Sequence, residues 1–158
     1  MQTLSVRIIS GGQTGVDRAA LDAAIEAGLP IGGWCPLGRR AEDGAIPDRY
    51  PMQETPTDAY PKRTKWNVRD SDVTLIVTRG DPDGGTALTL RFAKAIGKPV
   101  RVIDLEAPPF VPMVRDWLQE LQPSVINVAG PRESSQPGIH AVAKAYLAEL
   151  FAPLDETP

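Results

Sequence analysis

Residues 6–22 read VRIISGGQTGVDRAALD, and this stretch decides the fold. The apolar, β-branched run over residues 6–9 is typical of a strand, and a helical pattern begins at Val16. A strand, a glycine turn and a helix in this order point backbone N–H groups and the positive helix end at an anion. Glycine has no Cβ, so the backbone can approach such a ligand closely. The stretch therefore predicts a phosphate-binding turn made by Gly11, Gly12, Gln13, Thr14 and Gly15.

Two well-known phosphate motifs do not fit this turn. A dinucleotide fingerprint would place glycine at Ser10 and an acidic residue after the second strand, where residues 32–35 read GGWC. A Walker A loop would continue with Gly-Lys-Ser or Gly-Lys-Thr. Thr14 and Asp17 have the spacing of a capping box, so a capped turn without a ligand is the alternative. Three glycines exceed what capping needs, which favours a ligand.

Strand and helix patterns alternate along the chain. Apolar runs predict strands at residues 5–10, 31–34, 72–78, 99–103 and 124–128. Helical patterns cover residues 15–27, 62–69, 84–96, 111–121 and 138–151. Gly28 and Gly97, each followed two residues later by proline, predict left-handed helix ends. We expect one α/β domain over residues 1–158, with a Rossmann-like, doubly wound, mainly parallel five-stranded sheet, helices on both faces and a frayed tail at 153–158.

Composition excludes several classes of protein. The chain has 158 residues, 42% of them hydrophobic, and a net charge of −3, so neither nucleic acid nor a membrane surface is an expected partner. No apolar run could span a bilayer, and no signal peptide is evident. The single cysteine, Cys35, cannot form an intramolecular disulfide, which favours the cytoplasm. His140 is the only histidine and has no partner at ligand spacing, so no protein-bound metal is expected.

Two later loops follow predicted strands and carry further candidate ligand contacts. Residues 79–86 read RGDPDGGT and lead into a helix, which predicts a second anion site at Gly84, Gly85 and Thr86; an ordinary strand–helix turn is the alternative. Residues 127–135 read NVAGPRESS and add Gly130, Arg132 and Glu133, with Arg132 able to clamp an oxyanion. In this loop Ser134 or Ser135 could instead cap the last helix.

Residues 35–61 form a connection too long for a simple turn, and such loops are often functional. Arg39 and Arg40 lie within it, so we expect a lid over an anionic ligand, with a solvated charged loop as the alternative. We expect Arg39, Arg40 and Arg132 to converge on that ligand. Trp34, Tyr50 and Tyr60 offer large apolar surfaces, which predicts a homo-oligomer, a dimer or a tetramer, that covers them.

Six ordered motifs resemble those of the molybdenum carrier family, whose members are circularly permuted relatives of the lonely-guy, lysine-decarboxylase-like Rossmannoid proteins. The motifs are SGGQTGVDRAALDAA, GGWCPLGRRAEDGAIP, YPMQET, RTKWNVRDSDVTLIV, GGTALT and NVAGPRESSQPGI, within residues 5–150. The resemblance implies a homo-oligomeric protein that binds molybdenum cofactor (molybdopterin), a phosphorylated pterin, and stores it or hands it over.

One departure from the related phosphoribohydrolases bears on catalysis. Those enzymes carry P-G-G-x-G-T-x-x-E with a catalytic Glu, whereas here Gly84-Gly85-Thr86 is followed by Thr89. We therefore expect a carrier for a phosphorylated pterin and no catalytic residue. The alternatives are a phosphoribohydrolase-like, nucleotide-processing enzyme, in which Glu42, Asp43 or Glu133 replaces the Glu, and a sensor of a nucleotide-derived ligand.

Overall fold

The computed structural model describes residues 6–152, so Ser5 of the first predicted strand and the predicted tail lie outside the described residues. A central sheet of five strands dominates the fold, and every neighbouring pair in it is parallel. Its strands, in spatial order, are β2 (Ile31–Gly32), β1 (Arg7–Ile9), β9 (Val125–Ala129), β7 (Val73–Thr78) and β8 (Val100–Asp104). The predicted five-stranded parallel sheet is confirmed.

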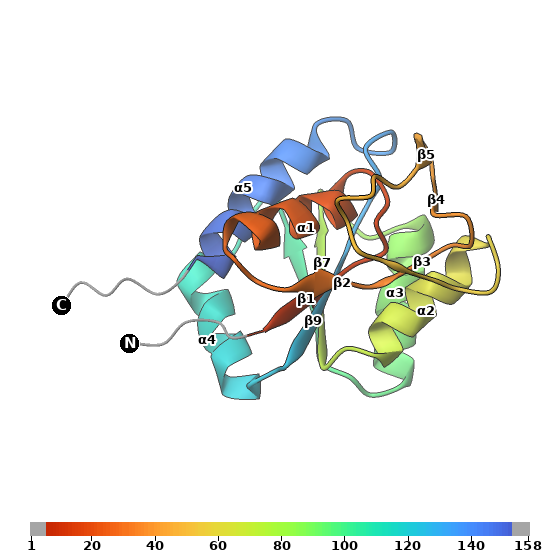
Figure 1. The fold of residues 1–158 in the computed structure, drawn as a ribbon. Helices are drawn as coiled ribbons and strands as arrows, with labels where there is room; N and C mark the ends of the chain where they lie inside the picture. The colour runs from red at the N-terminus through yellow and green to blue at the C-terminus, as the bar shows by residue number, and fades with distance from the viewer. Residues whose placement is uncertain (1–5, 153–158) are drawn as a thin grey trace.

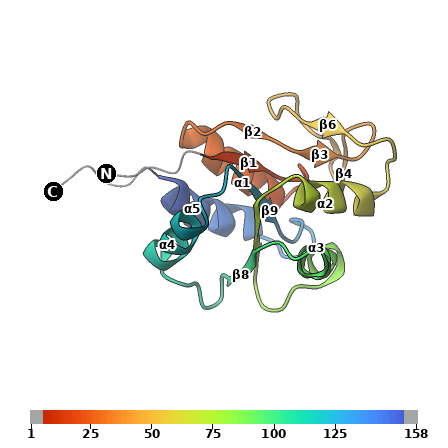
Figure 2. The same ribbon diagram turned by 90° about the horizontal axis from the view of Figure 1, so that it is seen from below.

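Helices cover both faces of this sheet (Figures 1 and 2). One face carries α1 (Val16–Glu26), α4 (Val111–Leu121) and α5 (Ile139–Phe151), with α1 and α5 packed side by side. The other face carries α2 (Tyr60–Arg69) and α3 (Gly84–Ala95), which also pack together. The strand most enclosed by this arrangement, β7, reads VTLIVT and is buried along its whole length. The predicted doubly wound arrangement is therefore confirmed.

The strand predicted at residues 31–34 is interrupted by Gly33. This glycine has a φ of +129°, and a Cβ there would lie 2.1 Å from the backbone oxygen of Ser10. The chain therefore leaves the central sheet after β2, and its continuation β3 (Trp34–Cys35) pairs with β6 (Gln53–Glu54) instead. Sequence patterning could not show this break, because the apolar run itself is continuous.

Residues 35–61 are ordered around a small apolar cluster of their own. The hairpin of β4 (Arg40–Ala41) and β5 (Gly44–Ala45) lies in this segment. Cys35, Ala41, Ile46 and Tyr50 pack with Leu21 of α1. Tyr50 is completely buried within the chain, and Trp34 packs edge-on against Trp66 at 4.7 Å between ring centroids. The expectation that Tyr50 needs a second copy to cover it is wrong.

The structure confirms the predicted left-handed helix ends and corrects the predicted N-terminal caps of α1 and α5. Gly28 and Gly97 have φ values of +75° and +73°, which confirms the left-handed ends. The capping box at Thr14 and Asp17 is wrong, because α1 begins after Gly15 and receives no side-chain cap. At α5 the Glu133 carboxylate, rather than Ser134 or Ser135, accepts the amides of Gly138 and His140. Within residues 6–152, no helix has the length and apolar character needed to cross a bilayer.

Candidate functional site

A cleft of about 470 Å³ opens beside the carboxyl end of β9. In parallel α/β sheets ligands bind at this edge, where the strand-to-helix loops meet. The glycine turn, α2, the start of α3 and the loop after β9 all contribute to its lining. Seven predicted site residues line the cleft: Gly11, Gln13, Gly84, Gly85, Thr86, Gly130 and Arg132. Six others are not among its lining residues: Gly12, Thr14, Gly15, Arg39, Arg40 and Glu133.

The backbone amides of the glycine turn are mostly engaged inside the protein. The amide of Gly12 donates to Ser10 Oγ at 3.4 Å, that of Gln13 to Asp17 Oδ2 at 3.2 Å, and that of Thr14 to Gln13 Oε1 at 3.0 Å. Side chains of the turn and of α1 therefore occupy the positions that an external anion was expected to fill. The turn shapes one wall of the cleft and leaves few amides for a ligand.

Close packing explains two of the glycines. Gly15 has a φ of +78°, and a Cβ there would lie 2.4 Å from the backbone oxygen of Pro131. At Gly130 a Cβ would lie 2.1 Å from the oxygen of Val77. Both contacts are with backbone atoms, which cannot move aside as a flexible side chain can. These glycines let the loops after β1 and β9 approach each other and neighbouring elements, so ligand binding is not needed to explain them.

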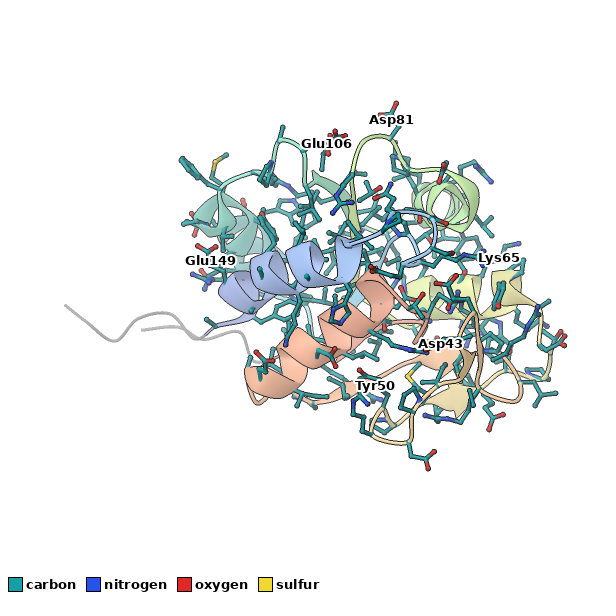
Figure 3. All side chains as sticks on the ribbon, turned by 90° about the horizontal axis from the view of Figure 1, so that it is seen from above. Asp43, Tyr50, Lys65, Asp81, Glu106 and Glu149 are labelled. Carbon is teal, nitrogen blue, oxygen red and sulfur yellow. The ribbon has the colours of Figure 1, made fainter. Side chains whose placement is uncertain are left out.

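The start of α3 differs from the glycine turn in its hydrogen bonding. No residue in the described part of the chain accepts a hydrogen bond from the amides of Gly84, Gly85 or Thr86. These first-turn amides line the cleft at the positive end of a 12-residue helix. Asp81, which could repel an anion, projects away from the molecule (Figure 3). Asp83 remains at the cleft.

Three arginines gather around Tyr60, which lines the cleft. Their guanidinium carbons lie 4.7 Å (Arg40), 5.3 Å (Arg63) and 5.8 Å (Arg132) from the ring centroid. Such cations over an aromatic ring are attracted to its π face. Arg63 and Arg132 also line the cleft, so positive charge is concentrated there although the chain as a whole is acidic.

Arg39 does not belong to this group, which corrects the expected convergence of Arg39, Arg40 and Arg132. Its side chain donates to the backbone oxygens of Ile46 (3.1 Å), Pro47 (2.9 Å) and Tyr50 (2.7 Å). Arg39 therefore holds residues 46–50 together. The third arginine beside Tyr60 is instead Arg63 of α2. The helical pattern of residues 62–69 does not indicate that Arg63 faces the cleft.

Asp17 is the buried acid of the cleft. Its Oδ2 accepts the Gln13 amide and lies 3.6 Å from Arg63 Nη1, which itself donates to the oxygen of Gly11 at 2.8 Å. Burial raises the pKa of Asp17 from 3.8 to about 6, although the charge of Arg63 opposes that rise. The sequence interpretation missed this role because the capping-box spacing offered a sufficient local explanation for Asp17.

In the enzyme alternative, one of three acids would replace the catalytic Glu of the related phosphoribohydrolases, but all three are engaged in other contacts. Glu42 accepts the Thr14 hydroxyl and both the amide and the hydroxyl of Ser134, and Asp43 forms a two-bond pair with Arg18 at 2.6 and 2.8 Å. Glu133 caps α5. Thr89 is buried, and its hydroxyl donates to the oxygen of Gly85 at 3.0 Å. None of the three acids is among the lining residues of the cleft.

In the part of the chain that the structure describes, no three or more His, Cys, Asp or Glu side chains are grouped so that they could hold a metal ion. Cys35 is buried, and burial raises the pKa of its thiol. The cleft is lined by first-turn amides, arginines, one aromatic ring and buried polar side chains.

Comparisons with known proteins identify a family and a related crystal structure. The model of the circularly permutated YpsA SLOG family matches residues 8–151. A crystal structure at 1.45 Å resolution, named "putative molybdenum carrier protein" and from Syntrophus aciditrophicus SB, is 44% identical in sequence. The match covers 96% of this chain and 97% of that one, with a TM-score of 0.88. A search of curated proteins gave no match. The two likenesses extend over nearly the whole chain, as the six sequence motifs predict.

Proposed function

The chain belongs to the circularly permutated YpsA SLOG family, and from this membership and its cleft we propose that it is a binding and carrier protein for a phosphorylated pterin, the molybdenum cofactor. The 44%-identical structure is named as a molybdenum carrier, which supports this choice of cargo. The proposal has two parts: the cleft binds a phosphorylated small molecule, and the ring of that molecule is a pterin.

The observation that carries the proposal is the set of amides at the start of α3 that have no acceptor among residues 6–152, inside an arginine-lined cleft. The amides of Gly84, Gly85 and Thr86 have no acceptor among residues 6–152, and Arg63 and Arg132 line the same cleft. Backbone amides at a helix start and guanidinium groups both stabilise phosphate oxygens. A phosphate at this position would satisfy donors that the protein itself leaves open.

The cleft also offers contacts for a flat ring. Tyr60 lines the cleft, so its side chain and the guanidinium groups of Arg63 and Arg132 beside it are the contacts available to a flat ring. No protein metal site was found among the described residues, so the cargo's own ligands, rather than side chains, would hold its metal. We therefore assign recognition to the phosphate and the ring of the cargo.

Mass spectrometry of the ligand that co-purifies under anaerobic conditions tests this proposal. We expect a phosphorylated pterin from the native protein, and its loss from Arg132→Ala. The matched control is Lys94→Ala, which removes one exposed positive charge from the last turn of α3, outside the cleft lining. A nucleotide in place of the pterin would overturn the assignment of a pterin ring and leave the binding of a phosphorylated molecule standing. Equal retention by both variants would overturn the assigned cleft.

The nucleotide-processing alternative keeps one specific observation in its favour. Asp17 is a buried cleft carboxyl with a pKa of about 6, and such a group can move a proton near neutral pH. Release of free base from nucleoside monophosphates by the native protein, abolished in Asp17→Asn, would support this enzyme. Thr89 stands where the related phosphoribohydrolases carry their catalytic Glu, so we expect no efficient release.

We also propose that residues 35–61 act as a lid. The Glu42 carboxylate ties the tip of the β4–β5 hairpin to Thr14 and Ser134, which flank cleft-lining residues. Ligand binding should then slow amide exchange over residues 35–61. Exchange that ignores a saturating ligand would reject the lid. The homo-oligomer and the cytoplasmic location stay predictions, the first to be checked by light scattering and the second by fractionation.

A further inference from the structure

Among the buried polar side chains that line the cleft, three have a carboxyl or amide atom that makes no hydrogen bond with residues 6–152. They are Gln13 (5% exposed), Asp17 (5%) and Asn127 (2%), and all three line the cleft. Within the described residues, only Gln119 Nε2 is a fully enclosed side-chain polar atom without a partner, so the free atoms of these three residues keep some access at the cleft wall, where a ligand can bond to them. We call these three residues the polar floor.

Asp17 contributes an acceptor to the polar floor. Its Oδ2 receives the Gln13 amide, whereas Oδ1 accepts no hydrogen bond within 3.5 Å from any residue between 6 and 152. The Gly11 amide faces the carboxyl and favours its charged form. An ionised carboxylate can only accept hydrogen bonds, so Oδ1 requires an N–H or O–H donor from the ligand.

Gln13 contributes a donor, and its orientation is fixed. The amides of Thr14 and Glu42 both donate to Gln13 Oε1, at 3.0 and 2.9 Å, so the oxygen end of this side chain is identified by two donors. Its Nε2 has no acceptor within the described residues. Asn127 Nδ2 donates to Thr74 Oγ1 at 3.3 Å, and in this orientation of the amide Asn127 Oδ1 is a second acceptor.

We propose that the polar floor recognises the 2-amino-4-oxopyrimidine edge that pterin and guanine share. This edge presents a ring N–H, an amino group and a carbonyl oxygen, and it thus complements two acceptors and one donor. The inference rests on the proposed function, since it concerns the ring of the same phosphorylated ligand. It goes further by assigning ring selection to Asp17, Gln13 and Asn127.

The same chemistry excludes adenine. Its corresponding ring nitrogen is an acceptor, which would face the acceptor-only carboxylate of Asp17. A site built to hydrogen-bond a ligand rejects an analogue that lacks the donor, because buried protein groups are then left unpaired. We therefore expect the cleft to bind GMP and neopterin monophosphate at least tenfold more tightly than AMP.

Isothermal titration calorimetry with four probes tests the inference. The probes are GMP, neopterin monophosphate, AMP and ribose 5-phosphate. In Asp17→Asn we expect the preference over AMP to fall at least tenfold, while the affinity for ribose 5-phosphate is retained. Asp81→Asn is the matched control, since it removes an exposed carboxylate outside the cleft lining. Tighter binding of neopterin monophosphate than of GMP would identify pterin as the occupant.

The ribose 5-phosphate probe separates selection of the ring from binding of the phosphate. If the native protein binds ribose 5-phosphate but shows no preference for GMP or neopterin monophosphate over AMP, the inference is overturned and phosphate binding stands. If none of the four probes binds, the proposed function fails as well. A preference that survives in Asp17→Asn also overturns the inference.

A second measurement on the native protein removes any dependence on folding of the variant. The ratio of GMP to AMP affinity should fall as the pH drops below about 6, because a protonated Asp17 becomes a donor as well as an acceptor. Both nucleotides carry the same phosphate, so the ratio cancels phosphate ionisation. A ratio that stays constant from pH 5 to pH 8 would overturn the inference.

Discussion

Tyr50 Oη donates a hydrogen bond to Asp22 Oδ1 at 2.6 Å, and this contact ties residues 35–61 to α1. The other Asp22 oxygen lies 2.9 Å from His140 Nε2 of α5, and Arg49 donates to Tyr50 Oη at 2.8 Å. The long segment is thus joined through one buried tyrosine to two helices on the same face of the sheet. This connection explains why the segment is ordered although it contains little regular structure.

Replacement of Tyr50 by phenylalanine should lower the free energy of unfolding by about 1.5–3 kcal/mol, the usual contribution of a hydrogen bond to a charged group. Urea unfolding measures this loss. Tyr146→Phe is the control, because it removes one hydrogen bond to the uncharged backbone oxygen of Pro109, worth about 1 kcal/mol. If Tyr50→Phe is no more destabilising than the control, the Tyr50–Asp22 contact does not anchor the segment.

Replacement of Gly85 by proline should weaken binding of ribose 5-phosphate about tenfold or more, because it removes one amide donor from the start of α3. Proline is tolerated in the first turn of a helix, so the fold should persist. Gly85→Ala keeps the amide and meets no neighbouring atom within 4 Å, so its affinity should be unchanged. Calorimetry on both variants separates loss of the donor from loss of glycine; equal affinities would argue against phosphate at α3.

The contribution of Asp17 to the stability of the native protein should fall as pH rises from 4 to 8. Its pKa is about 6 in the folded state and 3.8 ordinarily, so the folded state favours the uncharged acid. Its contribution to stability is present below pH 3.8 and is lost as the pH passes through about 6. At 1.36 kcal/mol per pKa unit the loss is about 3 kcal/mol.

Asp17→Asn isolates this pH-dependent contribution, because the asparagine side chain does not ionise. The difference in unfolding free energy between the variant and the native protein should shift by about 3 kcal/mol in favour of the variant between pH 4 and pH 8. Any cost of the substitution that does not depend on pH cancels in this comparison. A difference that stays constant over the range would show that Asp17 is not held in a burial-dominated site.

Replacement of Arg39 by alanine should mainly lower stability, whereas replacement of Arg132 by alanine should mainly weaken ligand binding. Arg39→Ala removes donors from three backbone oxygens and should destabilise the fold by about 2 kcal/mol or more. Arg132 is exposed, so Arg132→Ala should change stability by less than about 0.5 kcal/mol yet weaken ribose 5-phosphate binding about tenfold. Binding to the native protein should also weaken with added salt. Equal phosphate affinity in Arg132→Ala and the native protein would remove Arg132 from the site.

The order of secondary-structure elements follows from local sequence. The run VTLIVT became a strand buried along its length, and the Gly-x-Pro punctuation after two helices marked their left-handed ends. Such features depend on neighbours within a few residues, so their pattern is visible in one dimension. The loops at the carboxyl edge followed from the same alternation, and seven of the predicted site residues do line the cleft.

Local sequence could not show which donors remain open for a ligand. The glycine turn has the expected composition, but Ser10, Gln13 and Asp17 fold back onto its amides, and Gly15 serves a close contact with Pro131. The amides of Gly84 and Gly85 in the other glycine-rich loop receive no such acceptor within residues 6–152. The two loops look alike in sequence and differ in what surrounds them.

By itself, the sequence determined the parallel α/β sheet, the order of its elements and the edge at which the cleft-lining loops meet, because strand and helix periodicity encodes burial along the chain. Only the tertiary structure decided that Arg63 replaces Arg39 beside Tyr60, that Tyr50 is buried within its own chain, and that Asp17 lies on the cleft floor. These outcomes depend on contacts between residues far apart in sequence, and side-chain direction across such contacts is set by packing rather than by local pattern.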